Sequence, residues 1–354
     1  MNWLQQRFED TQLMMLLASL LGIFVLLILL GDILAPLLVA IALAYVLDGV
    51  VDLLCHCRVP RLPAILLVGT GAMLIVLFAM LSLLPLLTEQ IGRLIGQVPQ
   101  YVQAMRTSLH DLQAHYAGWI NPEYLQQLLA KLAETLQGWG GDLLSFSLSS
   151  IPGLITLLVY AVIVPVLVFF LLKDKDKLIV WGQRFLPRDR ALLHRVWGEV
   201  DIQIGNYIRG KFWESFIVGI AMWLVFWLMG HEYALLLGTL TGISVWIPFV
   251  GAAVVTIPVV LLSFFQWGWT ETTLYSLIAY TIIQALDANV IVPWLFSEIV
   301  NMHPIAIVVA ILVFGSLWGV LGVFIAIPMA ALVQSVLAIV LERNQPNPET
   351  SSPV

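Results

Sequence analysis

Long apolar runs separated by short polar segments fill most of the chain, and six runs have the length of a membrane span. A transmembrane helix needs roughly 18 to 20 mostly apolar residues. The first run carries no small-residue cleavage site, so we expect it to be retained. The predicted spans are residues 13–30, 33–54, 63–87, 151–172, 212–229 and 273–296. The pattern therefore predicts an all-α polytopic membrane protein.

Two further apolar runs are too long for one simple span and are broken near their centres. Residues 234–265 would extend roughly 48 Å as one helix, against a hydrocarbon core of about 30 Å. Pro248 and Gly251 fall at the middle of this run, and residues 304–341 are broken near 318–322. Each half of the first run has about 14 residues, too few to cross. We predict two re-entrant helical hairpins; the alternative is that both runs cross, which gives eight spans.

A span followed by a hairpin occurs twice, in residues 212–265 and 273–341. If both hairpins re-enter, the two copies have opposite topology, an arrangement that places substrate sites near the midplane of secondary transporters. The connecting loops 266–272 and 297–303 contain no Lys or Arg, so charge does not decide between re-entry and crossing.

Residues 89–149 differ from the rest, because apolar side chains recur there at helical spacing among polar ones. A leucine stripe between residues 125 and 136 predicts an extramembrane amphipathic helix that serves as a packing surface. The predicted regions are 1–88 (three spans), 89–149 (periplasmic helical segment), 150–211 (fourth span and basic loop), 212–341 (transport region) and 342–354 (disordered tail).

Basic residues set the expected orientation. Nine of the sixteen Lys and Arg residues fall in residues 173–211, so the positive-inside rule places this segment in the cytosol. Counting spans outward from it puts both termini in the cytoplasm.

The composition of the chain and the motifs that it lacks argue against several functional classes. Hydrophobic residues make up 60% of the chain and charged residues 11%, whereas soluble domains have about 25% charged residues. The chain has no G-x-x-x-x-G-K phosphate loop and no Ser/His/Asp constellation, so we expect neither ATP hydrolysis nor another enzymatic activity. Cys55, His56 and Cys57 lack further ligands for a metal. We expect no cofactor and no nucleic-acid partner.

Asp287 is the candidate centre of function, because it is a carboxylate inside the last predicted span. A charged group at membrane depth costs roughly 2.5–3.5 kcal/mol and is retained mostly where it has a role. Gln284 shares its helical face, Asn289 follows, and Pro293 frees the carbonyl of Asn289. These groups suit a proton, a Na⁺ ion or a solute hydroxyl. The alternative is a structural acceptor that caps hairpin N–H groups.

Five stretches resemble the autoinducer-2 exporter family of transporters: LDANVIVPWLFSEIVNMHP, GSLWGVLGVFIAIP, FFLLKDKDKL, YIRGK and VWIPFVGAAVVTIPVV. The resemblance covers nearly the whole chain. It implies an inner-membrane transporter with two hairpins, a homo-oligomer (a pentamer), and an elevator-like motion. Some members are described as sodium/proton antiporters.

The site residues that the resemblance implies fall in three groups. They are Asp287, Asn289 and Pro293; the first hairpin tip, Pro248 with Gly251; and the second, Gly315, Gly319 and Gly322 with Pro328. The alternative for the glycines and prolines is close packing alone.

The functional prediction is a secondary transporter that exports a small polar or signalling molecule across the lipid bilayer, with coupling to H⁺ or Na⁺ as one form. Na⁺/H⁺ antiport is one alternative. A membrane scaffold without transport is the other, in which residues 89–149 and 173–211 do the work. Helices broken at membrane depth favour transport, because unpaired backbone there lines a cavity or is covered by protein.

Cysteine labelling tests the orientation. We expect Arg188→Cys to react with an impermeant maleimide only from the cytosolic side, because it lies in the most basic segment. A cysteine in residues 89–149 should react from the periplasm. Periplasmic labelling of Arg188→Cys would overturn the orientation.

Overall fold

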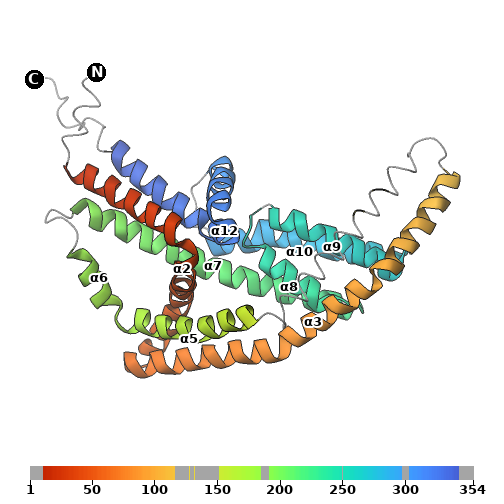
Figure 1. Cartoon of the computed structure of the whole chain (residues 1–354), viewed down its shortest axis with the longest axis horizontal. Coiled ribbons are helices and arrows are strands. Elements are labelled where there is room, and N and C mark those ends of the chain that lie inside the picture. Colours follow the sequence, from red (N-terminus) through yellow and green to blue (C-terminus); the bar gives the residue numbers. More distant parts are fainter. Residues whose placement is uncertain are drawn as a thin grey trace, which may run out of the picture. The chain divides into compact units, whose positions relative to one another are not determined.

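The structure is a computed structural model that describes residues 11–115, 127, 131, 151–184, 191–248, 250–296 and 303–342. These residues form helices joined by short turns and no strands (Figure 1). The helices are α2 (Thr11–His56), α3 (Arg61–His115), α5 (Ile151–Lys173), α6 (Lys175–Gln183), α7 (Ala191–Leu228), α8 (Ala234–Ser244), α9 (Val250–Trp267), α10 (Glu271–Leu286), a π-helical turn (Asp287–Ile291), α11 (Val292–Phe296) and α12 (Pro304–Glu342).

Among the described residues, five helical stretches are long and apolar enough to cross a membrane. They are Ile33–His56, Arg61–Tyr101, Asp201–Leu228, Val250–Trp267 and Glu271–Phe296. Four shorter apolar helices accompany them: Val159–Lys173, Ala234–Ser244, Ile305–Gly319 and Gly322–Gln334. The chain is thus an all-α, multi-pass membrane protein, as the apolar pattern predicts.

The first two predicted spans, residues 13–30 and 33–54, are continuous in one helix, α2, so the predicted separation of the two spans by a turn at residues 31–32 is wrong. Figure 1 shows α2 bent along its length, and Pro36 inside it lacks the N–H that a straight helix needs. The indole of Trp318 occupies the space beside Gly31, where a Cβ would lie 3.1 Å from its Cδ1. Gly31 therefore provides room for a side chain from another helix.

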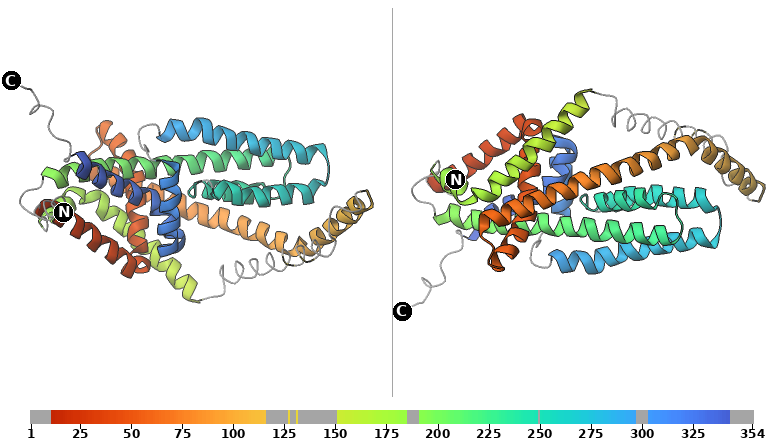
Figure 2. Two further views of the ribbon diagram at one scale, coloured as in Figure 1. Left: turned by 90° about the horizontal axis from the view of Figure 1, so that it is seen from above. Right: turned by 90° about the horizontal axis from the view of Figure 1, so that it is seen from below.

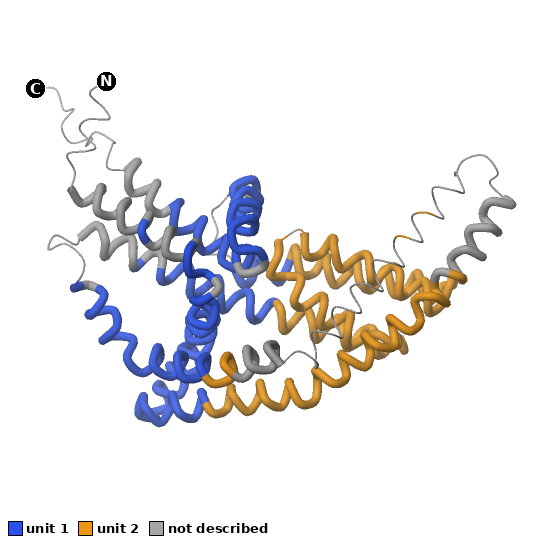
Figure 3. The backbone as a smooth tube through the Cα atoms, viewed as in Figure 1, with its two compact units in different colours: residues 1–69, 163–214, 290–354 blue, residues 70–162, 215–289 orange. Residues whose placement is uncertain are grey.

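The chain divides into two compact units (Figure 3). Unit 1 comprises Met1–Gly69, Ile163–Glu214 and Val290–Val354, and unit 2 comprises Thr70–Val162 and Ser215–Asn289.

In unit 1, α12 reverses direction at Gly319, whose φ of 59° lies in the left-handed region that favours glycine. A Cβ on Gly322 would lie 1.8 Å from the carbonyl oxygen of Phe314, so the two arms touch backbone to backbone. Ala310, Ile311 and Phe314 of one arm pack with Ala326 of the other. The second predicted hairpin is therefore a hairpin in the structure.

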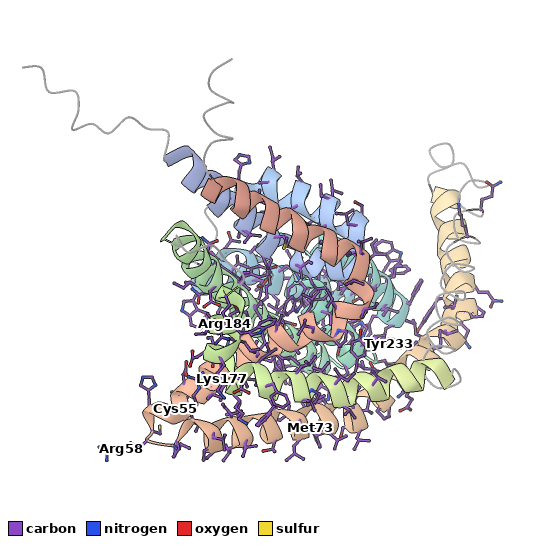
Figure 4. All side chains as sticks on the ribbon, turned by 60° about the vertical axis from the view of Figure 1, so that its left-hand side comes forward. Cys55, Arg58, Met73, Lys177, Arg184 and Tyr233 are labelled. Carbon is purple, nitrogen blue, oxygen red and sulfur yellow. The ribbon has the colours of Figure 1, made fainter. Side chains whose placement is uncertain are left out.

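An ion-pair cluster joins three parts of unit 1. Asp48 of α2 is 9% exposed and accepts a 2.9 Å hydrogen bond from Lys175, at the start of α6, and Arg61 of α3 lies 3.6 Å away. Figure 4 labels Cys55, near the end of α2, and Arg58, in the turn before α3. Within the described residues, no group of three or more metal-ligating side chains is found, at this turn or elsewhere.

In unit 2, α8 and α9 form the first hairpin, and α9 packs against α10 (Figure 2). The halves have 11 and 18 residues. The expectation that each half is too short to cross is therefore wrong for α9, which rises about 27 Å and reaches nearly across a core of about 30 Å.

Glycines bring α7 and α8 together within unit 2. A Cβ on Gly219 would lie 3.3 Å from the carbonyl oxygen of Gly238 and 3.3 Å from the Cα of Gly242. The hydroxyl of Ser215 donates a 2.6 Å hydrogen bond to the carbonyl of Gly242. Small residues and a hydroxyl at a helix crossing are typical of membrane proteins, where packing replaces the hydrophobic effect.

Helix α3 extends well beyond the predicted third span, and its residues contact the first hairpin at the end opposite its tip. Gln90 accepts from the N–H of Leu236 at 2.9 Å, and Gln97 accepts from the hydroxyl of Tyr233 at 2.7 Å. The ring of Tyr101 stacks on Phe265 with centroids 4.4 Å apart. Met73, nearer the start of α3, is half exposed (Figure 4). The leucine stripe predicted between residues 125 and 136 and the tail 343–354 lie outside the described residues, apart from residues 127 and 131.

Substitution of the crossing glycines tests the hairpins. We expect Gly251→Ala and Gly322→Ala each to destabilise the protein by about 3 kcal/mol or more, because a methyl group would collide with a backbone oxygen that has no room to move. Melting temperature in detergent is the measurement.

Gly96→Ala is the matched control, since nothing lies within 4 Å of its added Cβ and alanine favours helix. Equal melting temperatures for Gly251→Ala and Gly96→Ala would contradict the close backbone crossing.

Candidate functional site

Asp287 lies at the point where α10 changes from α-helical to π-helical bonding. Its N–H is directed to the carbonyls of Gln284 and Ile283, and the π-helical turn runs from Asp287 to Ile291. Pro293 explains the wide turn, because its ring crowds the carbonyl of Asn289 and its nitrogen donates no hydrogen bond. Single π-helical turns inside α-helices occur frequently at functional sites.

Asp287 continues a polar stripe on the face of α10 that packs against α9. The stripe recurs at three- and four-residue steps through Thr273, Ser276, Tyr280 and Ile283 to Asp287, and all five residues are buried. Asp287 itself is 8% exposed. The acidic side chain is therefore directed inward with the stripe.

Hydroxyl groups fix the register between α9 and α10. Ser263 and Ser276 are joined by a 2.9 Å hydrogen bond, and both side chains are fully buried. Closer to Asp287, the hydroxyl of Tyr280 lies 2.9 Å from that of Thr256 and donates to the carbonyl of Ala252 at 3.1 Å. Because the helices are antiparallel, this register continues to the hairpin tip at the level of Asp287.

The tip of the first hairpin is a tight turn with its own hydrogen bonds. Ser244 accepts from the N–H of Ile247 at 3.0 Å, and Ile247 accepts from Gly251 at 2.8 Å. A Cβ on Gly251 would lie 1.8 Å from the Ser244 carbonyl oxygen. Pro248, half-buried at the turn, accepts from Val250 at 2.7 Å. Asp287 thus shares one end of unit 2 with a turn of polar backbone groups.

Gln284 adds an amide to this end of unit 2. It is half-buried, one turn before Asp287 on the same face. Its amide nitrogen is buried and makes no hydrogen bond with any of the residues that the structure describes. A buried amide donor in that state can bind a polar ligand without losing an existing bond.

Asn289 and Pro293 are placed differently from Asp287. Both are exposed, and the Asn289 amide donates to the carbonyl of Ala285 in its own helix at 2.8 Å. Asp287, Gln284, Pro248 and Gly251 all belong to unit 2, and the register between α9 and α10 puts them at the same end of it. The other predicted residues, Gly315, Gly319 and Gly322, form the hairpin of unit 1, and Pro293 also belongs to unit 1.

Sequence reasoning missed the hydroxyl residues Thr256, Ser263, Ser276 and Tyr280. The signal that could have found them is the i, i+3, i+7 recurrence of Thr273, Ser276 and Tyr280 in an otherwise apolar helix. It also missed the pair Lys211 and Glu214. Lys211 is not at the end of a loop, because α7 begins at Ala191 and contains it.

At the opposite end of α9, a buried histidine lies in the turn between α7 and α8. His231 is 4% exposed, with the rings of Phe226 and Trp267 at centroid distances of 5.4 and 5.1 Å. Its Nδ1 accepts from the N–H of Tyr233 at 3.2 Å. Burial lowers the pKa of His231 to about 4, so the ring is neutral at physiological pH.

Comparison with known proteins agrees with this architecture. The sequence model of the family described as "AI-2E family transporter" matches residues 13–342. PerM of Escherichia coli K12, which is named as a permease, is 42% identical over 341 residues, 95% of this chain and 96% of PerM. YueF of Bacillus subtilis, named as a transport protein, is 27% identical over an alignment that includes 85% of this chain and 82% of YueF. The AI-2 transport protein TqsA of Escherichia coli K12 is 23% identical, over 87% of this chain and 86% of TqsA.

The buried histidine predicts a pH dependence of stability. Above pH 6.5 the ring is neutral in both folded and unfolded chains, so it has no differential effect. Between pH 6.5 and 4 the unfolded chain binds the proton and the folded chain does not. As the pH is lowered through this range, the free energy of unfolding should therefore decrease by up to about 1.4 kcal/mol per pH unit. We expect His231→Asn, which keeps an acceptor near Nδ1 but does not titrate, to flatten this part of the melting profile.

His303→Asn is the control, because His303 accepts the N–H of Ile305 through the same ring nitrogen but is exposed. Parallel melting profiles for wild type and His231→Asn between pH 7 and 4.5 would rule out the histidine as the cause.

Proposed function

Because the chain belongs to the AI-2E family of transporters, we propose that it is a secondary transporter that exports a small polar or signalling molecule through a site at Asp287. The observation that carries this proposal is a buried carboxylate at a π-helical turn, level with the tip of a helical hairpin. Carboxylates at membrane depth mark ion and substrate pathways in transporters.

The neighbouring groups support a polar ligand. The buried amide nitrogen of Gln284, the carboxylate of Asp287 and the turn carbonyls around Pro248 supply one donor and several acceptors at the same end of unit 2. A hydroxylated solute uses both kinds of group, whereas a bare cation would use only the acceptors.

An elevator-like mechanism is part of the proposal. Such a mechanism needs a compact body that carries the binding site as a whole. Unit 2 has this property, because hydroxyl contacts join α9 to α10 and glycine contacts join α7 to α8. Motion of this body would carry Asp287 with the hairpin.

Coupling to H⁺ or Na⁺ follows from the chemistry of one carboxylate. A carboxylate binds either a proton or a metal cation, so exchange of one for the other at Asp287 would couple transport to an ion gradient. Na⁺/H⁺ antiport is the form in which the ion itself is the cargo. The alternative, a scaffold role without transport, would use the Asp287 carboxylate as a structural hydrogen-bond acceptor.

Setting and assembly complete the proposal. We place the protein in the bacterial inner membrane with both termini in the cytoplasm, because nine of sixteen basic residues fall in residues 173–211. A homo-oligomer, a pentamer, is the proposed assembly.

Substitution of Asp287 tests the transport site. We expect Asp287→Asn to insert and assemble normally but to lose transport at least about tenfold, since an amide keeps the shape and loses the charge that binds the proton or cation. The measurement is counterflow in proteoliposomes with a solute panel, with and without pH and Na⁺ gradients, normalised to intact protein.

Thr281→Val is the matched control, because Thr281 is exposed on the same helix and its hydroxyl donates to the backbone carbonyl of Leu277. Wild-type flux with an unchanged pH dependence in Asp287→Asn would remove Asp287 from the mechanism. Absence of transport by the wild type for every solute and gradient would favour the scaffold.

A further inference from the structure

Basic side chains gather in unit 1 where three apolar helices end or begin. The apolar stretches Ile33–His56 and Val159–Lys173 end there, and Arg61–Tyr101 begins there. Asp48 pairs with the first residue of α3 and the first residue of α6, so these helix ends lie together. Because apolar stretches occupy the hydrocarbon core, their ends lie at the level of the lipid headgroups. The basic residues at this level, called the basic surface below, are Arg58, Arg61, Lys173, Lys175, Lys177 and Arg184.

Arg58 occupies a backbone position that favours glycine. Its φ is 68°, in the left-handed region. It caps the end of α2, since its N–H donates to the carbonyl of Cys55 at 3.0 Å and the N–H of Val59 donates to that of Leu54 at 3.2 Å. Glycine is the usual residue at this place in such a cap. The Arg58 side chain is exposed, so packing does not compensate for the strained backbone, and a role for the guanidinium does.

Helix α6 carries an exposed face on which basic and apolar side chains alternate. Lys177, Trp181 and Arg184 follow one another at i, i+4 and i+7, and all three are exposed (Figure 4 labels the two basic residues). Leu178 and Val180 flank this face and are 44% and 53% exposed. Tryptophan and basic side chains with apolar neighbours are typical of helices that lie in the headgroup region of a membrane.

The basic surface has an excess of positive charge. Residues 48–61 and 173–195 together contain nine Lys and Arg against five Asp. Lys177 pairs at 2.8 Å with an aspartate three residues before it, yet its side chain remains 82% exposed. Lys175 and Arg61 share one buried carboxylate, and their side chains remain 37% and 46% exposed. These cations therefore keep N–H donors for an anion that approaches from outside.

The combination of cations and exposed apolar side chains selects the ligand. A free phosphate ion would use the cations and leave the apolar side chains of α6 without a partner. The headgroups of phosphatidylcholine and phosphatidylethanolamine carry an ammonium group that offsets the phosphate charge. An anionic phospholipid supplies a phosphodiester without that ammonium, together with acyl chains. We propose that the basic surface binds the headgroup of an anionic phospholipid, and that the exposed apolar side chains of α6 lie at the boundary with its acyl chains.

Two segments of the chain share the headgroup. The turn between α2 and α3 supplies Arg58 and Arg61. Helix α6 supplies Lys175 and Lys177, and the carboxylate shared by Lys175 and Arg61 holds the two segments together. A bound phosphodiester adds a second link between α6 and the ends of α2 and α3. The proposal goes beyond the proposed function, because it involves neither Asp287 nor a transported solute.

The test uses the full-length protein in a neutral detergent, stripped of lipid. The probe is dioctanoyl phosphatidylglycerol. Dioctanoyl phosphatidylcholine has the same chains with a compensated headgroup, and glycerol phosphate is a headgroup without chains. Melting temperature and native mass spectrometry report binding. We expect phosphatidylglycerol to raise the melting temperature, less so at high salt, and both other compounds to bind at least about tenfold more weakly.

Substitution of Arg58 separates lipid binding from folding. We expect Arg58→Gly to melt at or above the wild-type temperature without lipid, because glycine adopts a positive φ without strain. The same variant should bind phosphatidylglycerol about fivefold more weakly, since each basic residue near an anionic surface contributes roughly that factor. A purely structural role for Arg58 does not combine a gain in melting temperature with a loss of lipid binding.

Further variants test the two parts of the surface. We expect Lys177→Gln to weaken binding about as much as Arg58→Gly, and Leu178→Ser to weaken it without changing its salt dependence. Arg93→Gln is the matched control. Arg93 is exposed on α3, belongs to unit 2, and pairs with Glu89 one turn away, as Lys177 pairs within its own segment. It should bind phosphatidylglycerol like the wild type.

Four results would overturn the proposal. Equal binding of phosphatidylcholine would show that charge does not select the lipid. Equal binding of glycerol phosphate would make the surface a site for free anions. Wild-type binding of phosphatidylglycerol by both Arg58→Gly and Lys177→Gln would place the lipid elsewhere, as would an equal loss in Arg93→Gln.

Discussion

Contact between backbones, made possible by glycine, is the constraint on which both hairpins depend. Gly251 meets the carbonyl of Ser244 and Gly322 meets that of Phe314, each so closely that no Cβ fits. A chain that reverses at membrane depth leaves N–H and C=O groups that lipid cannot satisfy. In the first hairpin the turn satisfies them internally, through bonds such as that from Ile247 to Ser244. Close crossing allows both arms to stay helical almost to the tip.

Hydroxyl groups determine how the candidate site on α10 is aligned with the first hairpin. Ser263 with Ser276, and Thr256 with Tyr280, join α9 to α10 at two levels. Apolar packing alone tolerates a shift of one turn, whereas a hydrogen bond between two specified side chains does not. These bonds therefore fix which residue of α10 is level with the hairpin tip. The next polar position of the stripe is Asp287, so helix register sets its level relative to the hairpin tip.

The sequence predicts the hairpins well, because their signals are local. Pro248, Gly251 and Gly319 are residues whose backbone preferences mark a turn wherever they occur in an apolar run. Other features depend on tertiary contacts that no local pattern contains. Gly31-Asp32 is compatible with a turn or a helix, and in the structure α2 continues while Trp318 fills the space beside Gly31.

The candidate site was predictable only in part. The spacing of Gln284 and Asp287 places them on one face, and the structure agrees. Asn289 follows Asp287 closely in sequence but does not share its face. A shift of two residues along a helix places the Asn289 side chain on an exposed face, where its amide donates to the carbonyl of Ala285. Lys211 was missed because a basic residue at the edge of an apolar run is ordinarily taken as the end of a loop. Its pairing with Glu214 three residues later is the signal that it is helical.

The two units bury charged groups in different surroundings. In unit 1, Lys211 and Glu214 lie 2.7 Å apart on one helix, and both are buried. In unit 2, Asp287 lies on a stripe of α10 whose other members carry hydroxyl groups or are apolar. A carboxylate exchanges a proton or binds a cation far more readily than a hydroxyl group does, which is why the proposed function rests on Asp287 rather than on the hydroxyl groups of the same stripe.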